Sequence, residues 1–247
     1  MVIAGFAGLI KTVPKIVIFD IDGTLLELLQ AETDAYLRAF DVCYGITGLS
    51  DDWDSYRFRT DIEIAREILD RHFARPCTAS EVSRVLNTYA SLLQGEVYGR
   101  GIMPKLIPGI RDVLYTLGKR MNIGLALATG NPEQISQLRL EKADLWKYFS
   151  CGSFAEDGKD KTSILSKALS RCHETWQDFI RREDIIFIGD HPGDAAAAHV
   201  LGVHFVGVTG QAERFRGLVN DQIHSDYRDL DGFLKHLERL WNNQPNT

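Results

Sequence analysis

The 247-residue sequence lacks the features that mark several specialised classes of protein. No segment reaches the roughly 18 unbroken apolar residues that a membrane-spanning helix needs, so we expect no membrane partner. The four cysteines form no CxxC pair and fit no zinc or disulfide framework, which favours a reducing, cytoplasmic setting. Dense runs of Lys or Arg are also missing and the formal net charge is -6, so a nucleic-acid partner is not predicted.

The composition that remains is that of an ordinary globular protein, with 45% hydrophobic and 25% charged residues. The length suits one large domain or two unequal ones, and it leaves the oligomeric state open. The apolar opening, residues 1–12, has no basic stretch before it, so we interpret it as a tail rather than a signal peptide. Residues 242–247 are assigned to a second tail.

Four short apolar segments predict buried strands, at Lys15–Phe19, Ile123–Ala128, 184–188 and 203–208. They are rich in Val, Ile and Phe, and they alternate with segments of helical periodicity. Strands that are apolar on both faces and separated by helices are typical of parallel sheets. We therefore predict an α/β fold with a Rossmann-like parallel-sheet core and helices on both faces.

Between the first two predicted strands the sequence shows only helical periodicity. Thr60 and Thr78 each begin a capping box, with Glu three residues later, and each opens a segment with apolar residues on one face. We predict an inserted all-helical domain over residues 28–104, and a core formed by 13–27 and 105–241. The linker that returns to the core is rich in Gly and Pro, as a hinge would be.

The first predicted strand ends in the motif FDIDGT, which contains Asp20 and Asp22. Ligands of parallel α/β sheets bind at the carboxyl ends of the strands. Two carboxylates spaced two apart can point the same way there and divide the roles of nucleophile and general acid/base. A purely structural Asx-turn is the alternative, whereas an EF-hand loop would need its Gly at position six.

The second predicted strand is followed by Thr129, Gly130 and Asn131. Asn131 suits a helix N-cap and Pro132 the first helical position, so a helix is expected to begin here. Its free N–H groups and the Thr129 hydroxyl would bind an anion. A capped turn without a ligand is the alternative.

A third polar cluster combines carboxylates with a cation. Asp190 and Asp194 follow a predicted strand in the motif GDHPGD and offer the oxygen ligands that magnesium prefers, although Asp194 could instead be only a helix N-cap. A cation must offset these carboxylates and a bound phosphate. Either Lys159 or Lys161, in the polar loop before the next helix, could supply it.

In their order and spacing, FDIDGT, ATGN, a loop lysine and GDHPGD resemble the haloacid dehalogenase superfamily, in its phosphatase branch and phosphoglycolate phosphatase-like. The inserted helices resemble the helical cap domain of that superfamily, and the resemblance covers about residues 15–240. It implies that Asp20 is the nucleophile and a metal ligand. It also implies that Asp22 is the general acid/base, with a backbone carbonyl that binds the metal.

The same resemblance implies that Thr129, with Gly130 and Asn131, binds phosphate, and that the metal is held further by Asp190 and Asp194. Lys161 is preferred as the active-site lysine because the apolar residues after it fall where the family's next helix has its apolar face. Two departures from the family pattern are visible. Neither lysine precedes a Pro, and His191 stands where Ser or Thr is common.

These residues predict a Mg²⁺-dependent phosphatase that hydrolyses a small phosphorylated metabolite through an aspartyl-phosphate. Arg57 and Arg59 precede the helix that starts after Thr60 and are candidates to contact an anionic part of the substrate, or are simply solvated. A phosphomutase, a dehalogenase and a non-catalytic phosphate-binding module are the alternatives. Asp22 argues against the dehalogenase branch, which resembles DxYGT and lacks this second Asp.

Overall fold

The computed structural model describes residues 15–120, 122–176, 180–219 and 223–242, so most of the two predicted tails lies outside it. Its core is a five-stranded parallel sheet with strand order β3-β2-β1-β4-β5. The strands are β1 (Lys15–Phe19), β2 (Ile123–Ala128), β3 (Cys151–Ser153), β4 (Ile185–Gly189) and β5 (His204–Gly207). The predicted α/β class is confirmed, and β3 is a strand that the sequence pattern did not indicate.

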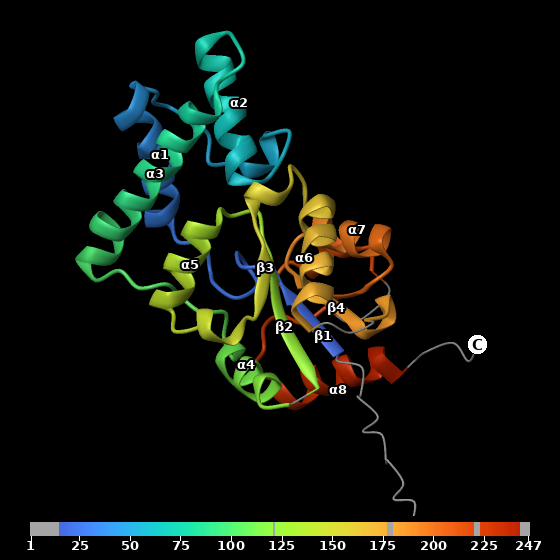
Figure 1. Cartoon of the computed structure of the whole chain (residues 1–247). Helices are drawn as coiled ribbons and strands as arrows, with labels where there is room; N and C mark the ends of the chain where they lie inside the picture. The colour runs from blue at the N-terminus through green and yellow to red at the C-terminus, as the bar shows by residue number, and fades with distance from the viewer. Residues whose placement is uncertain (1–14, 121, 177–179, 220–222, 243–247) are drawn as a thin grey trace, which may run out of the picture.

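Helices cover both faces of this sheet (Figure 1). The helices of the core are α4 (Ile110–Gly118), α5 (Glu133–Lys142), α6 (Lys161–Trp176), α7 (Pro192–Leu201) and α8 (Leu230–Asn242). Alternate residues of β1 point to opposite faces, as strand geometry requires. Val17 and Phe19 pack with α4 and α8, whereas Ile16 and Ile18 pack with α6 and α7. Both faces are apolar because both are covered.

Three further helices are inserted between β1 and α4 and stand above the sheet in Figure 1. They are α1 (Gln30–Tyr44), α2 (Asp61–Phe73) and α3 (Ala79–Leu92). They share a hydrophobic cluster of their own, which includes Tyr36, Phe40 and Val85. We call this inserted helical unit the cap.

The two predicted capping boxes of the cap differ in the structure. Thr78 accepts the N–H of Glu81 at 3.2 Å and the Glu81 carboxylate accepts the N–H of Thr78 at 2.7 Å, so this box is complete. Thr60 accepts the N–H of Glu63 at 3.3 Å, but the Glu63 carboxylate lies 3.3 Å from Arg66 Nε instead. The second box is therefore only half formed.

The two chain segments that join the cap to the core run side by side. The N–H of Glu27 donates to Lys105 O at 2.8 Å, and the N–H of Ile107 donates to Leu25 O at 3.0 Å. Between them, Leu26 and Leu106 form an antiparallel bridge. The outgoing and returning linkers thus form one short paired segment, placed next to the residues that follow β1.

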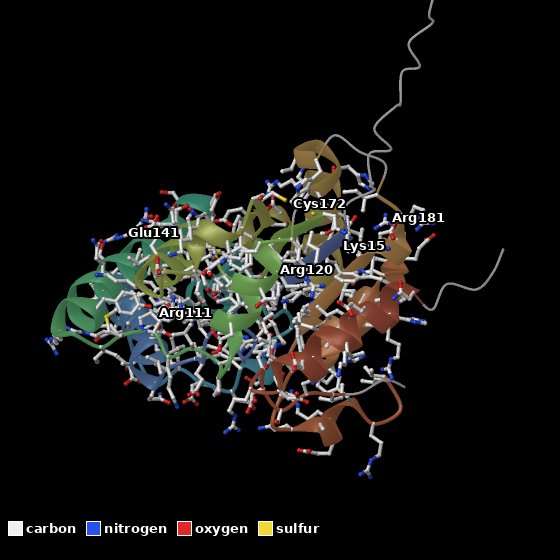
Figure 2. The ribbon with its side chains drawn as sticks, turned by 90° about the horizontal axis from the view of Figure 1, so that it is seen from below. Lys15, Arg111, Arg120, Glu141, Cys172 and Arg181 are labelled. Carbon is white, nitrogen blue, oxygen red and sulfur yellow. The ribbon has the colours of Figure 1, made fainter. Side chains whose placement is uncertain are left out.

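Ion pairs lie at the edge of the sheet where the strands begin. Lys15, at the start of β1, and Arg181 both pair with the buried carboxylate of Asp184, and Figure 2 shows the two cations close together in the view from below. Within the described residues, no helix combines the length and apolar character needed to cross a membrane. The polar residues that follow the strands lie at the carboxyl edge of the sheet, beneath the cap.

Candidate active site

Asp20 and Lys161 meet at the carboxyl edge of the sheet. Asp20 follows β1, and its N–H donates to Ile188 O of β4 at 2.9 Å. Lys161 begins α6, and its Nζ lies 2.9 Å from Asp20 Oδ2. Burial raises the pKa of Asp20 to about 6 in spite of this cation. Burial opposes the charged form of Lys161, but the carboxylates of Asp194 and Asp20 raise its pKa, so it remains an ammonium. Lys159, the other candidate, is exposed.

Asp190 and Asp194 form an acidic cluster with Asp20. One carboxylate oxygen from each residue lies within 4.8 Å of the other two. Gly23 makes room for this cluster, because its φ is 70° and a Cβ at this position would overlap the Asp190 carboxylate. Burial, followed by the charges of Asp20 and Asp194, raises the pKa of Asp190 to about 8. Three carboxylates this close favour a bound cation.

The donor atoms of this cluster fit Mg²⁺, which prefers oxygen ligands and takes few of them from protein. Asp20 Oδ1 is buried and has no hydrogen-bond partner among the described residues. Asp194 is already held, because its Oδ1 lies 3.1 Å from Lys161 Nζ and its Oδ2 accepts the N–H of His191 at 3.1 Å. The carboxylate of Asp22 is not part of the cluster. Only its backbone carbonyl remains for the metal role that we predicted.

The Asp22 side chain turns away from the acidic cluster towards α5. Its Oδ2 accepts a hydrogen bond from Asn131 Nδ2 at 3.0 Å, and its Oδ1 lies 2.7 Å from Arg139 Nη2. Burial would raise the pKa of Asp22, but the Arg139 guanidinium and the Asn131 amide lower it overall. The two carboxylates of the FDIDGT motif therefore have opposite environments, because burial disfavours the charged form of Asp20 whereas Arg139 and Asn131 stabilise the charged form of Asp22.

Thr129, Gly130 and Asn131 follow β2 and line the same cavity as Asp20. The Thr129 N–H donates to Ser153 O at 3.0 Å, and its Oγ1 accepts the N–H of Asn131 at 3.3 Å. The predicted start of α5 is wrong, because the helix begins at Glu133 and Pro132 is its N-cap. Asn131 does not cap the helix, since its amide bonds to Asp22 and Arg139 instead.

A cavity of about 480 Å³ lies between the cap and the carboxyl edge of the sheet. Aromatic side chains of the cap line it, among them Tyr36, Trp53 and Tyr89. Arg57 and Arg59 line it as well. Arg59 pairs with Asp54 and its Nη1 lies 3.1 Å from His191 Nε2, so it bridges the cap and the core at the mouth. Arg57 is exposed and lies over the Phe58 ring.

Three charged residues near the cavity were missed by sequence reasoning. Arg139 and Glu32 are each 1% exposed and form an ion pair of 3.0 Å. Asp61 begins α2, and its N–H donates to Gly130 O at 3.0 Å. One signal was available for Arg139. It lies four residues after Ile135 and directly before Leu140, on the buried side of α5, where an arginine is unusual.

The chain is similar to known proteins over most of its length. The pattern of the family described as haloacid dehalogenase-like hydrolase matches residues 17–208. A phosphoglycolate phosphatase from Salmonella paratyphi A is 28% identical over 235 residues, which cover 87% of this chain and 90% of that protein.

Two solved structures illustrate the similarity in fold. One is β-phosphoglucomutase from Clostridium difficile, with a TM-score of 0.68, 18% identity and coverage of 93% of this chain and 97% of that one. The other, a predicted phosphoglycolate phosphatase from Haemophilus somnus, has a TM-score of 0.65 and 18% identity, and covers 91% of this chain and 99% of that one.

Proposed function

The chain belongs to the haloacid dehalogenase-like hydrolase family, and from this premise we propose that it is a magnesium-dependent phosphatase with Asp20 as its nucleophile. The observation that carries the proposal is the position of Asp20. Its Oδ2 is held by Lys161 at 2.9 Å, while its Oδ1 is buried without a hydrogen-bond partner in the described part of the chain. One oxygen is thus fixed and the other remains for a ligand.

We assign the metal to Asp20, Asp190 and the backbone carbonyl of Asp22, with Asp194 holding the surrounding groups in place. When bound, Mg²⁺ would supply positive charge to offset the repulsion between the Asp20 carboxylate and an anionic phosphate. Asp194 contributes indirectly, because it fixes the Lys161 ammonium at 3.1 Å and the backbone before α7.

The roles that we assign to this chain's own residues are those that membership of the family implies. Asp20 attacks the phosphorus and forms an aspartyl-phosphate, while Asp22 gives a proton to the departing oxygen. Asp22, once deprotonated, takes a proton from the water that hydrolyses the intermediate. Thr129, Lys161 and the N–H of Gly130 are the candidates to hold the transferring oxygens, and the N–H of Asn131 could join them by leaving Thr129 Oγ1.

The cap would bind the remainder of the substrate and exclude water. The cavity of about 480 Å³ is large enough for a small metabolite, which agrees with the expected substrate class. Salmonella phosphoglycolate phosphatase is a relative, so 2-phosphoglycolate is the first compound to test. Arg57 and Arg59 are the cations of the cap that could face the carboxylate of such a substrate. The cytoplasmic setting inferred from the cysteines stays a prediction.

The test is release of inorganic phosphate from a panel of phosphate monoesters, which should include 2-phosphoglycolate, hexose phosphates and 4-nitrophenyl phosphate. We expect turnover with Mg²⁺ and its loss after exhaustive treatment with a chelator, with recovery when Mg²⁺ is restored. Isomerisation of a hexose phosphate without release of phosphate would identify a phosphomutase instead. Phosphate binding without turnover of any ester would identify a non-catalytic module.

A further inference from the structure

Arg139 is the most thoroughly buried cation among the described residues of the cavity wall, with an exposure of 1%. It lies on α5, which Figure 1 places below the cap helices α1 and α3, and its neighbour Ile135 packs into the hydrophobic cluster of the cap. An arginine in such a place requires charged or polar partners, because an unpaired buried charge is strongly unfavourable. The identity of these partners indicates what Arg139 does.

The Arg139 guanidinium contacts two parts of the protein that are separate in sequence. In the core, Nη1 donates to Asn131 Oδ1 at 2.8 Å and Nη2 lies 2.7 Å from Asp22 Oδ1. In the cap, the same Nη2 donates to Glu32 Oε2 at 3.0 Å, near the start of α1. Glu32 is fixed in turn by Tyr98, whose hydroxyl donates to Oε1 at 2.5 Å. The three partners of the guanidinium are thus Asn131, Asp22 and Glu32, and none is a substrate atom.

This geometry gives the Asp22 carboxylate two neighbours that fix its direction. Asn131 donates a hydrogen bond to Oδ2 at 3.0 Å, and Arg139 forms an ion pair of 2.7 Å with Oδ1, which has no hydrogen-bond partner among the described residues. Since Asn131 is itself bonded to Arg139, removal of the guanidinium frees both contacts. A planar guanidinium suits this task because its donors are fixed relative to one another, whereas a lysine would offer only a point charge.

We propose that Arg139 is a positioning residue for Asp22, and that Glu32 of the cap holds Arg139 in place, so that the proton-transferring carboxylate is aligned only when the cap is seated on the core. The inference rests on the proposed function, since it needs Asp22 to transfer a proton. It adds a contact, from Glu32 through Arg139 to Asp22, that connects the cap to the proton-transfer step. Nucleophilic attack by Asp20 does not depend on this link.

The test compares two substrates that have the same ring but different leaving groups. Phenolate is a poor leaving group and needs a proton from Asp22, whereas 4-nitrophenolate departs readily without one. Loss of alignment should therefore lower kcat/KM for phenyl phosphate about ten- to a hundredfold more than for 4-nitrophenyl phosphate, within the range attributed to general acid catalysis. Asp22→Asn provides the reference for complete loss of proton transfer.

Arg139→Met alone would leave Glu32 buried without its cation and could prevent folding. The double variant Arg139→Met/Glu32→Gln removes both charges and is the decisive protein. Arg171→Met is the matched control, because Arg171 is a half-buried arginine that pairs with Asp157 at 2.6 Å but does not line the cavity. This control should change thermal stability without changing the ratio between the two substrates.

A selective loss for phenyl phosphate in the folded double variant, together with partial recovery in Arg139→Lys, is the expected result. An equal loss for both substrates, with the wild-type ratio retained, would show that Arg139 is only structural and would overturn the inference while leaving the phosphatase intact. Failure of the wild-type protein to hydrolyse either ester in Mg²⁺ would count against the proposed function first, and against the inference with it.

Discussion

The Lys161 ammonium offsets the repulsion between the carboxylates of the acidic cluster. Its ammonium lies 2.9 Å from Asp20 and 3.1 Å from Asp194, at the carboxyl edge of the sheet. We expect Lys161→Met to lower kcat for 4-nitrophenyl phosphate at least about a hundredfold, since removal of one preorganised group that stabilises developing charge typically has this effect. Lys159→Met is the matched control. Its side chain is exposed, so the same assay should give the wild-type rate.

Asp61 gives a pH-dependent prediction at the same scale. Burial and the nearby Asp22 charge raise its pKa to about 8 from an ordinary value of 3.8. Between these values the folded protein keeps a proton that the unfolded chain has lost, so the free energy of unfolding falls as pH rises through this window. Asp61→Asn removes that titration. Its gain in melting temperature over wild type should be small near pH 5 and larger near pH 8, and a gain that does not vary with pH would contradict the assignment.

At the scale of elements, the sequence predicted those strands and helices that have enough residues to show a period. The strands β1, β2, β4 and β5 were placed within a residue of their observed ends because each consists mainly of consecutive apolar residues. The three residues of β3 are too few to show a pattern, and one of them is Gly152. The start of α5 was missed for another reason. The Asn131 side chain bonds to Asp22, which is remote in sequence, and to Arg139 on α5, and so does not cap the helix.

The capping box of α3 gives a prediction for an element of the cap. Thr78→Ala removes the side-chain oxygen that accepts the N–H of Glu81, and we expect a loss of about 1 kcal/mol in the free energy of unfolding. Ser83→Ala, at an exposed position inside the same helix, is the control and should be neutral or slightly stabilising. Denaturant titration of both variants measures the difference. Equal stabilities would mean that this cap contributes nothing to the folded state.

At the scale of the whole molecule, the meeting of the motifs could be predicted because parallel strands end at one edge of a sheet. Asp20, Thr129 and Asp190 follow three different strands and line one cavity, as their spacing suggested. The contacts between cap and core could not be predicted. Arg139 and Glu32 are 107 positions apart, and no local pattern links them. Their pairing depends on how the cap is seated, which periodicity within single segments does not report.

Arg59 gives a prediction for the contact between the cap and the core. It pairs with Asp54 and contacts His191 across the mouth of the cavity, yet its side chain is 43% exposed. Exposed ion pairs contribute roughly 0–1 kcal/mol, so we expect Arg59→Ala to leave the melting temperature nearly unchanged. The KM of the best substrate in the panel should rise, with a smaller change in kcat. Arg66→Ala, which removes a cap ion pair away from the cavity, should alter neither constant. An unchanged KM in Arg59→Ala would exclude Arg59 from substrate binding.

The proposed mechanism requires that Asp20 receives the phosphoryl group. Asp22→Asn keeps the nucleophile but removes the base that activates water, so the intermediate should accumulate with a substrate that has a good leaving group. Rapid acid quench followed by mass spectrometry should show about 80 Da of added mass, the mass of a phosphoryl group, on the peptide that contains Asp20. Asp20→Asn should show none. Labelled phosphate on Asp20→Asn, or on a residue other than Asp20 in Asp22→Asn, would contradict the mechanism.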